Sequence, residues 1–155
     1  MIPFPLLYRQ QGTTLIEVLI TLVILSIGLL GLALLQVTSV QSNQSAYYRS
    51  QVTVLAYDLA DRMRANRDAA LGDAYVFDFP DSSSANSVSG TQAQKDKAEW
   101  LNTLALSLPE GTGKVEKTGT LVSISIRWND NRGRIKEVDS NAEDGIETFV
   151  YRTEI

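Results

Sequence analysis

The stretch from Gly12 to Leu35 reads GTTLIEVLITLVILSIGLLGLALL, and it is the most apolar part of the chain. From Val18 onward this stretch carries no charged residue. As an α-helix, Val18 to Leu35 spans roughly 27 Å at about 1.5 Å per residue, which is close to the hydrocarbon thickness of a bilayer. The sequence therefore predicts a transmembrane helix over about residues 15–35.

Two ordinary interpretations of such a helix are a secretory signal peptide and an uncleaved single-span anchor. A signal peptide is cut after its apolar segment in an A-x-A-like pattern, whereas the chain after Leu35 reads QVTSVQSNQ. Glu17 also lies inside the apolar stretch, where a charge costs ~3 kcal/mol at a helix centre and less near an end. We expect Glu17 either to have a partner or to lie at the level of the lipid headgroups.

Two glycines, Gly28 and Gly31, interrupt the apolar run. Small residues allow two membrane helices to approach closely, so these glycines are candidate helix-packing positions. The alternative is that a membrane helix simply tolerates glycine at these positions.

Downstream of the apolar run, the helical pattern continues and becomes amphipathic. With no proline between Pro5 and Pro80, the sequence predicts one helix from about Thr14 to about Asn66. Apolar residues that recur at three- and four-residue spacing mark one face of this helix: Val52, Leu55, Leu59 and Met63.

The opposite surface of this predicted helix is charged. Its spacing allows Asp58 to pair with Arg62, and Asp61 with Arg64. We interpret this surface as a solvated face whose acidic and basic side chains pair with one another. A partner site built from the same arginines is the alternative.

The remainder of the chain is predicted to supply a core for the amphipathic half of the helix. Residues 72–90 form a polar loop in which Tyr75, Phe77 and Phe79 alternate, as in a short edge strand or a packed flap. Residues 91–106 are predicted to form a short helix beside Trp100. The apolar stripe expected on that helix consists of Ala98, Leu101, Ala105 and Leu108.

In the C-terminal part of the chain, apolar residues recur at every second position, which is typical of half-buried strands. Residues 121–128 form the clearest strand, residues 149–155 repeat the pattern, and residues 113–118 make a shorter third strand. In the first of these, one face is predicted to be apolar: Val122, Ile124, Ile126 and Trp128. The sequence thus predicts an α+β fold with a small antiparallel sheet packed on the long helix.

Residues 129–147 are predicted to form a loop with a turn at 131–133 and an acidic group that includes Asp139, Asn141 and Glu143. A calcium loop that starts at Asp139 would need glycine at position 144 and a bidentate acid at position 150. Those positions hold Asp144 and Val150, so no metal site is predicted.

Composition excludes several classes of function. The 155 residues include no Cys and no His, which removes thiol nucleophiles, imidazole-based triads and the usual zinc ligands. A formal net charge of −4 argues against a broad phosphate-binding surface, so no nucleic acid partner is expected. Neither a phosphate cradle nor a catalytic carboxylate pair is visible. We predict that the chain is not an enzyme and needs no cofactor.

The residues Gly12-Thr13-Thr14-Leu15-Ile16-Glu17-Val18-Leu19 resemble the processing site of type IV prepilins. The resemblance implies that a prepilin peptidase and N-methyltransferase cuts between Gly12 and Thr13 and methylates the new amino terminus. Residues 1–12 would then be a leader, and the apolar helix would be retained. Thr13 stands where the family most often has Phe or Met.

Cleavage after Gly12 would leave an amine about one helical turn before Glu17. The electrostatic attraction between this amine and the Glu17 carboxylate of a neighbouring subunit is far stronger in a low-dielectric helix bundle than in water. Burying an unpaired Glu17 carboxylate in the same bundle remains unfavourable. The family's equivalent glutamate has this role in assembly, so Glu17 is predicted to select the axial register of the subunit.

A second resemblance narrows the family. The residues LAYDLADRMRANR from Leu55 to Arg67, and SIGLLGLA from Ser26 to Ala33, are similar to minor pilins of the PilV type, also called type IV pilus modification proteins. The resemblance implies a type IV pilin fold with a long helix over residues 13–67 and a periplasmic globular head over residues 68–155.

The resemblance implies a subunit that takes part in priming, assembly or tip structure of a type IV pilus. Its partners would be other minor pilins, the major pilin and the inner-membrane assembly machinery. It would lie in the inner membrane before assembly and in the extracellular pilus afterwards. The alternatives are a minor pseudopilin of a type II secretion system and, from another class, a single-span membrane-anchored binding module that retains residues 1–12.

Overall fold

The computed structural model describes residues 14–80, 86–131 and 145–155. The chain divides into two compact units, one that ends at Ser39 and one from Val40 to Ile155. Helix α1, Leu15–Ala65, begins in the first unit and ends in the second. The single long helix predicted from about Thr14 to Asn66 is therefore confirmed.

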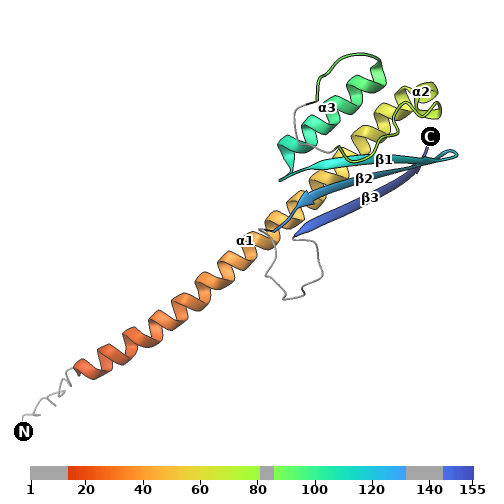
Figure 1. Cartoon of the computed structure of the whole chain (residues 1–155). Coiled ribbons are helices and arrows are strands. Elements are labelled where there is room, and N and C mark those ends of the chain that lie inside the picture. The colour runs from red at the N-terminus through yellow and green to blue at the C-terminus, as the bar shows by residue number, and fades with distance from the viewer. Residues whose placement is uncertain (1–13, 81–85, 132–144) are drawn as a thin grey trace, which may run out of the picture. The chain divides into compact units, whose positions relative to one another are not determined.

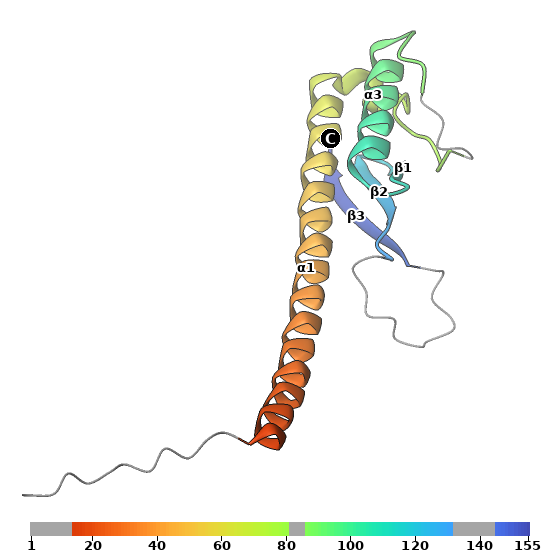
Figure 2. The same cartoon turned by 90° about the vertical axis from the view of Figure 1, so that its left-hand side faces the viewer.

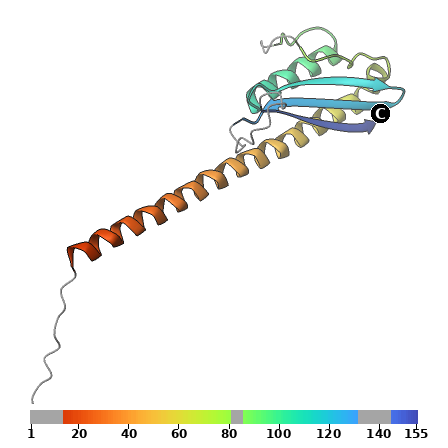
Figure 3. The same cartoon turned by 60° about the horizontal axis from the view of Figure 1, so that its bottom comes forward.

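Within the second unit, three strands form an antiparallel sheet in the order β1-β2-β3, as Figure 1 shows. They are β1, Thr112–Thr118, β2, Leu121–Asn129, and β3, Ile146–Glu154. The β1–β2 hairpin turns through Gly119, whose φ of 65° suits glycine. The pairing of β2 with β3 runs from Leu121↔Glu154 to Asn129↔Ile146 (Figure 3).

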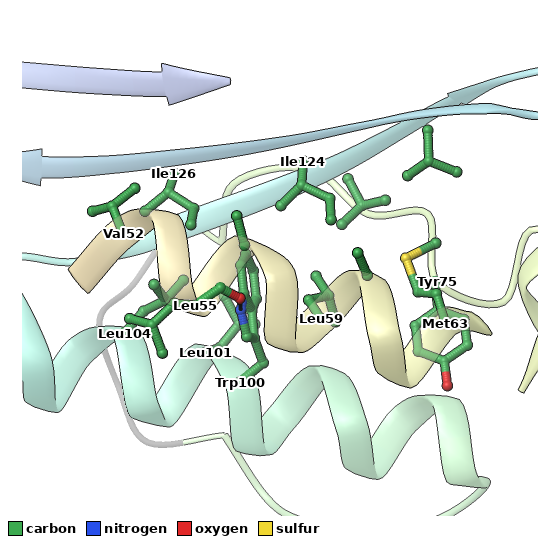
Figure 4. Close-up of a cluster of buried hydrophobic side chains, with 14 of the residues drawn as sticks. Val52, Leu55, Leu59, Met63, Tyr75, Trp100, Leu101, Leu104, Ile124 and Ile126 are labelled. Atoms are coloured by element: carbon green, nitrogen blue, oxygen red, sulfur yellow. Dashed lines mark hydrogen bonds between the residues drawn. The ribbon is translucent and has the colours of Figure 1, made fainter. Parts of the chain in front are cut away.

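Helix α3, Gln92–Ser107, and the last turns of α1 cover one face of this sheet (Figure 2). Helix α3 begins with a capping box, in which Thr91 and Gln94 each bond the other's backbone N–H. The core fills the space between these helices and the sheet (Figure 4). The predicted apolar faces of α1 and of β2 are buried in it, and the predicted α+β fold is confirmed.

The predicted stripe on α3 needs a correction. Ala105 is exposed, and Leu104 takes its place in the core. Trp100 is fully buried rather than beside the stripe, and its Nε1 donates to the carbonyl oxygen of Leu55 at 2.8 Å. The other three residues of the predicted stripe, Ala98, Leu101 and Leu108, are buried as expected, so the prediction is wrong only at Ala105.

The segment after α1 also differs from the prediction. A short helix α2, Arg67–Leu71, lies between α1 and the polar loop that was expected from residue 72. No separate helix was predicted there. Of the two forms predicted for this segment, the edge strand is reduced to one antiparallel bridge between Phe77 and Val115 of β1, and the packed flap fits better because Phe77 packs against the core. Tyr75 is fully buried, and the ring of Phe79 lies 3.7 Å from the guanidinium carbon of Arg127.

Candidate assembly site

The start of α1 is fixed by Thr14. Its side-chain oxygen and its carbonyl oxygen both accept from the backbone N–H of Glu17, at 3.3 and 3.0 Å. Threonine is a favoured residue for this bond because it satisfies a donor that the first turn leaves free. Glu17 thus lies in the first turn of the helix, where its side chain is exposed.

The helix beyond Glu17 is apolar on every side, and no residue of the first unit that the structure describes is buried. The exposed fractions of its large apolar side chains between Val18 and Leu35 run from 46% to 69%. Among the described residues, α1 is the one helix long and apolar enough to cross a membrane. A surface of this kind needs lipid or other helices around it.

The hydroxyl groups within this apolar surface bond back to the helix. Thr21 donates to the carbonyl oxygen of Glu17 at 2.6 Å, and Ser26 donates to that of Leu22 at 2.7 Å. These bonds satisfy the hydroxyls without water, which suits a lipid environment. In contrast, the carboxylate of Glu17 has no ion-pair partner among the described residues.

Gly28 and Gly31 lie in the middle of the apolar surface. A Cβ atom added at either glycine would meet no other atom within 4 Å. Inside one subunit these positions are therefore open space. Gly12 and Thr13, the residues of the predicted cleavage site, lie outside the described residues.

The charged face of α1 pairs with itself as the spacing predicted, with Arg64 and Asp61 2.7 Å apart, but it also makes contacts beyond its own helix. Arg62 does pair with Asp58 at 3.0 Å, and it also reaches α3, with Glu99 at 2.8 Å and Asp96 at 3.7 Å. The hydrogen bond to Glu99 raises the pKa of Arg62 most, and the charge of Asp58 adds to it. Arg62 is therefore a structural link between two helices.

A buried polar network continues from Asp96. Its Oδ2 accepts from the hydroxyl of Tyr75 at 2.5 Å, and its Oδ1 accepts from the amide of Gln92 at 2.7 Å. Burial, and then the bond to Asp96, raise the pKa of Tyr75 to about 12. Asp96 occurs in a polar stretch of the sequence, so no pattern indicated that this carboxylate would be buried.

A second link joins α1 to the end of β2. Ser45 donates to Oδ2 of Asp130 at 2.5 Å, and Asp130 is only 2% exposed. Its Oδ1 and the Nε1 of Trp128 are buried without a hydrogen-bond partner among the described residues. Burial of Asp130 was not predicted, because residues 129–147 were expected to form a solvated loop.

No group of three or more potential metal ligands occurs among residues 14–80, 86–131 and 145–155. The acidic group at Asp139, Asn141, Glu143 and Asp144 lies outside the described residues, as do most residues of the predicted turn at 131–133. The arrangement that the described residues do form is a capped, fully exposed apolar helix joined to a packed α+β unit.

Comparison with known families gives two matches that adjoin along the chain. The model of the prokaryotic N-terminal methylation motif matches residues 7–33, which include Gly12 to Glu17. The model described as type IV pilin Tt1218 matches residues 34–98, which include the whole amphipathic part of α1. No curated protein and no solved structure matches the chain.

The first match implies processing by a prepilin peptidase and assembly with the pilus machinery. The apolar helix is consistent with anchoring in a membrane before that assembly. Pilins are structural rather than catalytic proteins. Two adjoining family matches over residues 7–98, together with a long N-terminal helix whose C-terminal part packs on a small antiparallel sheet, identify this chain as a type IV pilin.

Proposed function

We propose that this chain is a minor pilin of the PilV type that takes part in priming, assembly or tip structure of a type IV pilus. Prepilin peptidase removes residues 1–12 and methylates Thr13, the helix over residues 13–67 is retained, and the head over residues 68–155 lies in the periplasm. The observation that carries the proposal is Glu17, a carboxylate without a described partner in the first turn of a fully exposed apolar helix.

The proposed role of Glu17 is to pair with the Thr13 amine of an adjoining pilin. The hydroxyls of Thr21, Ser26 and Thr38 each donate to a carbonyl oxygen of their own helix. In contrast, the carboxylate of Glu17 stays available for a partner on another subunit. An ion pair in a low-dielectric bundle forms at one axial register and is costly at the others. Glu17 therefore sets how far one subunit is displaced along its neighbour.

Gly28 and Gly31 are proposed as positions of close helix approach. Because an added Cβ meets nothing in the single subunit, alanine there is expected to leave the subunit intact and to favour the helix slightly. A loss of assembly in Gly28→Ala would then report contact with a neighbouring helix. Assembly equal to wild type would show that these glycines are merely tolerated.

The test of the proposed function is intact-mass analysis of the chain from membranes and from sheared pili of the native host. A mass that begins at Thr13, with one added methyl group, and a small amount of the chain in the sheared fraction are expected. Gly12→Val should block processing and keep residues 1–12 on the chain, while Gly31→Ala is the matched glycine control and should be processed normally.

Other outcomes would replace the proposal with an alternative. A processed chain that is absent from pili and whose deletion stops protein secretion would be a minor pseudopilin of a type II secretion system. A wild-type chain that retains residues 1–12 would be a membrane-anchored binding module. For Glu17, the comparison is Glu17→Ala with Ser26→Ala, and equal amounts of both in pili would remove its role in register.

A further inference from the structure

Strand β3 forms an open edge of the sheet. It pairs with β2 along its whole length, and no other strand pairs with it in the part of the chain that the structure describes (Figure 3). The N–H of Ile155 donates to the carbonyl oxygen of Thr120 at 3.2 Å. Because bonded positions alternate along an antiparallel pair, the odd-numbered residues of β3 bond to β2. The N–H and C=O groups of Thr148, Val150 and Arg152 therefore point away from the sheet.

This edge lacks the features that usually keep an edge strand from pairing. Natural edges are blunted by proline, lysine, bulges or short length. Strand β3 reads IETFVYRTE, which contains no proline and no lysine and is rich in residues that favour strands. Its register with β2 continues over nine residues without a bulge. The residues whose backbone groups point outward are also exposed, so the edge is open to a partner.

Strand β3 runs in the same direction as the part of α1 on which it packs. Glu147, near the start of the strand, lies 3.9 Å from Arg49. Thr153, near its end, accepts from the guanidinium of Arg64 at 2.7 Å. Because neighbouring strands are antiparallel, β1 also runs with α1, and only β2 runs against it.

These directions limit what can pair with the open edge. Two copies of this chain in one membrane have their α1 helices in the same orientation, so a strand antiparallel to β3 must run against α1. Among the described residues only β2 does so, and both of its edges are already paired. A second copy therefore has no free antiparallel strand to offer.

We propose that the open edge of β3 binds an extended segment of a different pilin subunit, which joins the sheet as an antiparallel strand. The inference rests on the proposed function, which supplies other minor pilins as neighbours. Antiparallel pairing is the more stable arrangement, and main-chain hydrogen bonds give strand addition its affinity. The segment carries an apolar residue opposite Val150 and an acidic residue opposite Arg152, because Arg152 is exposed and has no ion pair among the described residues.

Val150→Pro tests the proposal, because it removes an N–H that points away from β2 and leaves the bonds to β2 in place. Val150→Ala is the matched control, since it shortens the side chain but keeps the N–H. In the native host, Val150→Pro is expected to lower the amount of the chain in sheared pili about tenfold relative to Val150→Ala. Thr148→Lys, which keeps every N–H and adds a charge that blunts edges, should lower it as well. If all three variants enter pili equally, the open edge is not a binding site.

Cross-linking in membranes separates this proposal from the proposed function, because it does not require entry into pili. The chain has no Cys, so Thr148→Cys introduces a single thiol at the edge for a photoactivatable cross-linker. The expected product joins this position to another pilin subunit and is lost when Val150→Pro is added. Glu116→Cys, at an exposed position of β1, is the control and should not give the product. Absence of the product, or a product with a second copy of this chain, would overturn the proposal.

Discussion

Gly113 shows how one residue without a side chain permits the packing of the largest residue in the core. A Cβ atom at Gly113 would lie 2.4 Å from Cη2 and 2.6 Å from Cζ3 of Trp100. The indole cannot move away easily, because Trp100 is fully buried and its Nε1 is bonded to Leu55. Overpacking of this kind typically costs 1–3 kcal/mol, so Gly113→Ala should lower the free energy of unfolding by about 2 kcal/mol.

Urea unfolding of the full chain in detergent, followed by tryptophan fluorescence, measures this loss. The matched control is Gly72→Ala, because the nearest atom to an added Cβ there is the carbonyl oxygen of Asp68 at 3.4 Å, an ordinary contact. If Gly113→Ala and Gly72→Ala unfold at the same urea concentration, close packing of Trp100 on Gly113 is wrong.

Tyr75 makes the free energy of unfolding depend on pH in the alkaline range. Its pKa is raised to about 12 by burial and then by the bond to Asp96, from 10.0 for a free tyrosine. Between these two pKa values Tyr75 keeps its proton in the folded chain but loses it in the unfolded chain. The stabilisation that the protonated Tyr75 gives to the fold is therefore complete below pH 10 and falls as the pH rises toward 12. The melting-temperature difference between wild type and Tyr75→Phe should therefore shrink above pH 10. A difference that stays constant from pH 8 to pH 11.5 would exclude this linkage.

At the scale of elements, Arg62 holds α3 against α1. Its guanidinium contacts Asp58, Glu99 and the buried Asp96. Arg62→Met keeps much of the side-chain volume but leaves Asp96 without its cation, so we expect a loss of about 1–2 kcal/mol in unfolding free energy. The control is Arg49→Met, since Arg49 is 63% exposed and lies 3.9 Å from Glu147, and a loss under about 0.5 kcal/mol is expected there. Equal losses would show that Arg62 is only a surface charge.

Periodicity predicted the elements because burial on one face leaves a repeat in the sequence. The apolar residues of α1 from Val52 to Met63 recur every three or four positions, and those of β2 recur every second position, as the structure confirms. Arg62 could not be predicted in the same way, since its partners on α3 are distant in sequence and follow no period. The short helix α2 was missed because five residues are too few to show a helical repeat.

The candidate assembly site was predictable to the extent that it is local in sequence. Glu17, Gly28 and Gly31 lie on one helix, and their exposure follows from the apolar run around them. The bond between the half-buried Ser45 and the buried Asp130 was not predictable, because 85 positions separate the two residues and both residue types are usually exposed. Only the fold brings them together.

At the scale of the whole molecule, the second unit contains its own hydrophobic core, as an independently folding domain does. Its core cluster lies between Tyr48 and Trp128 and draws mainly on α1, α3 and β2, with Val115 from β1, while no described residue before Val40 belongs to it. A fragment from Val40 to Ile155 should therefore fold in aqueous buffer without detergent or lipid. Its near-UV circular dichroism, dominated by the buried Trp100 and Trp128, should match that of the full chain.

The same fragment separates the folding of this pilin from its assembly. Because the helix surface before Val40 is exposed and apolar, its removal deletes the surface proposed for register and close approach and leaves the core untouched. The fragment should melt cooperatively within a few degrees of the full chain, and it should not enter pili when it is expressed in the periplasm of the native host. Loss of near-UV signal in the fragment would mean that the first unit contributes to the fold. Incorporation into sheared pili would mean that assembly depends on the head rather than on Glu17 and the apolar helix.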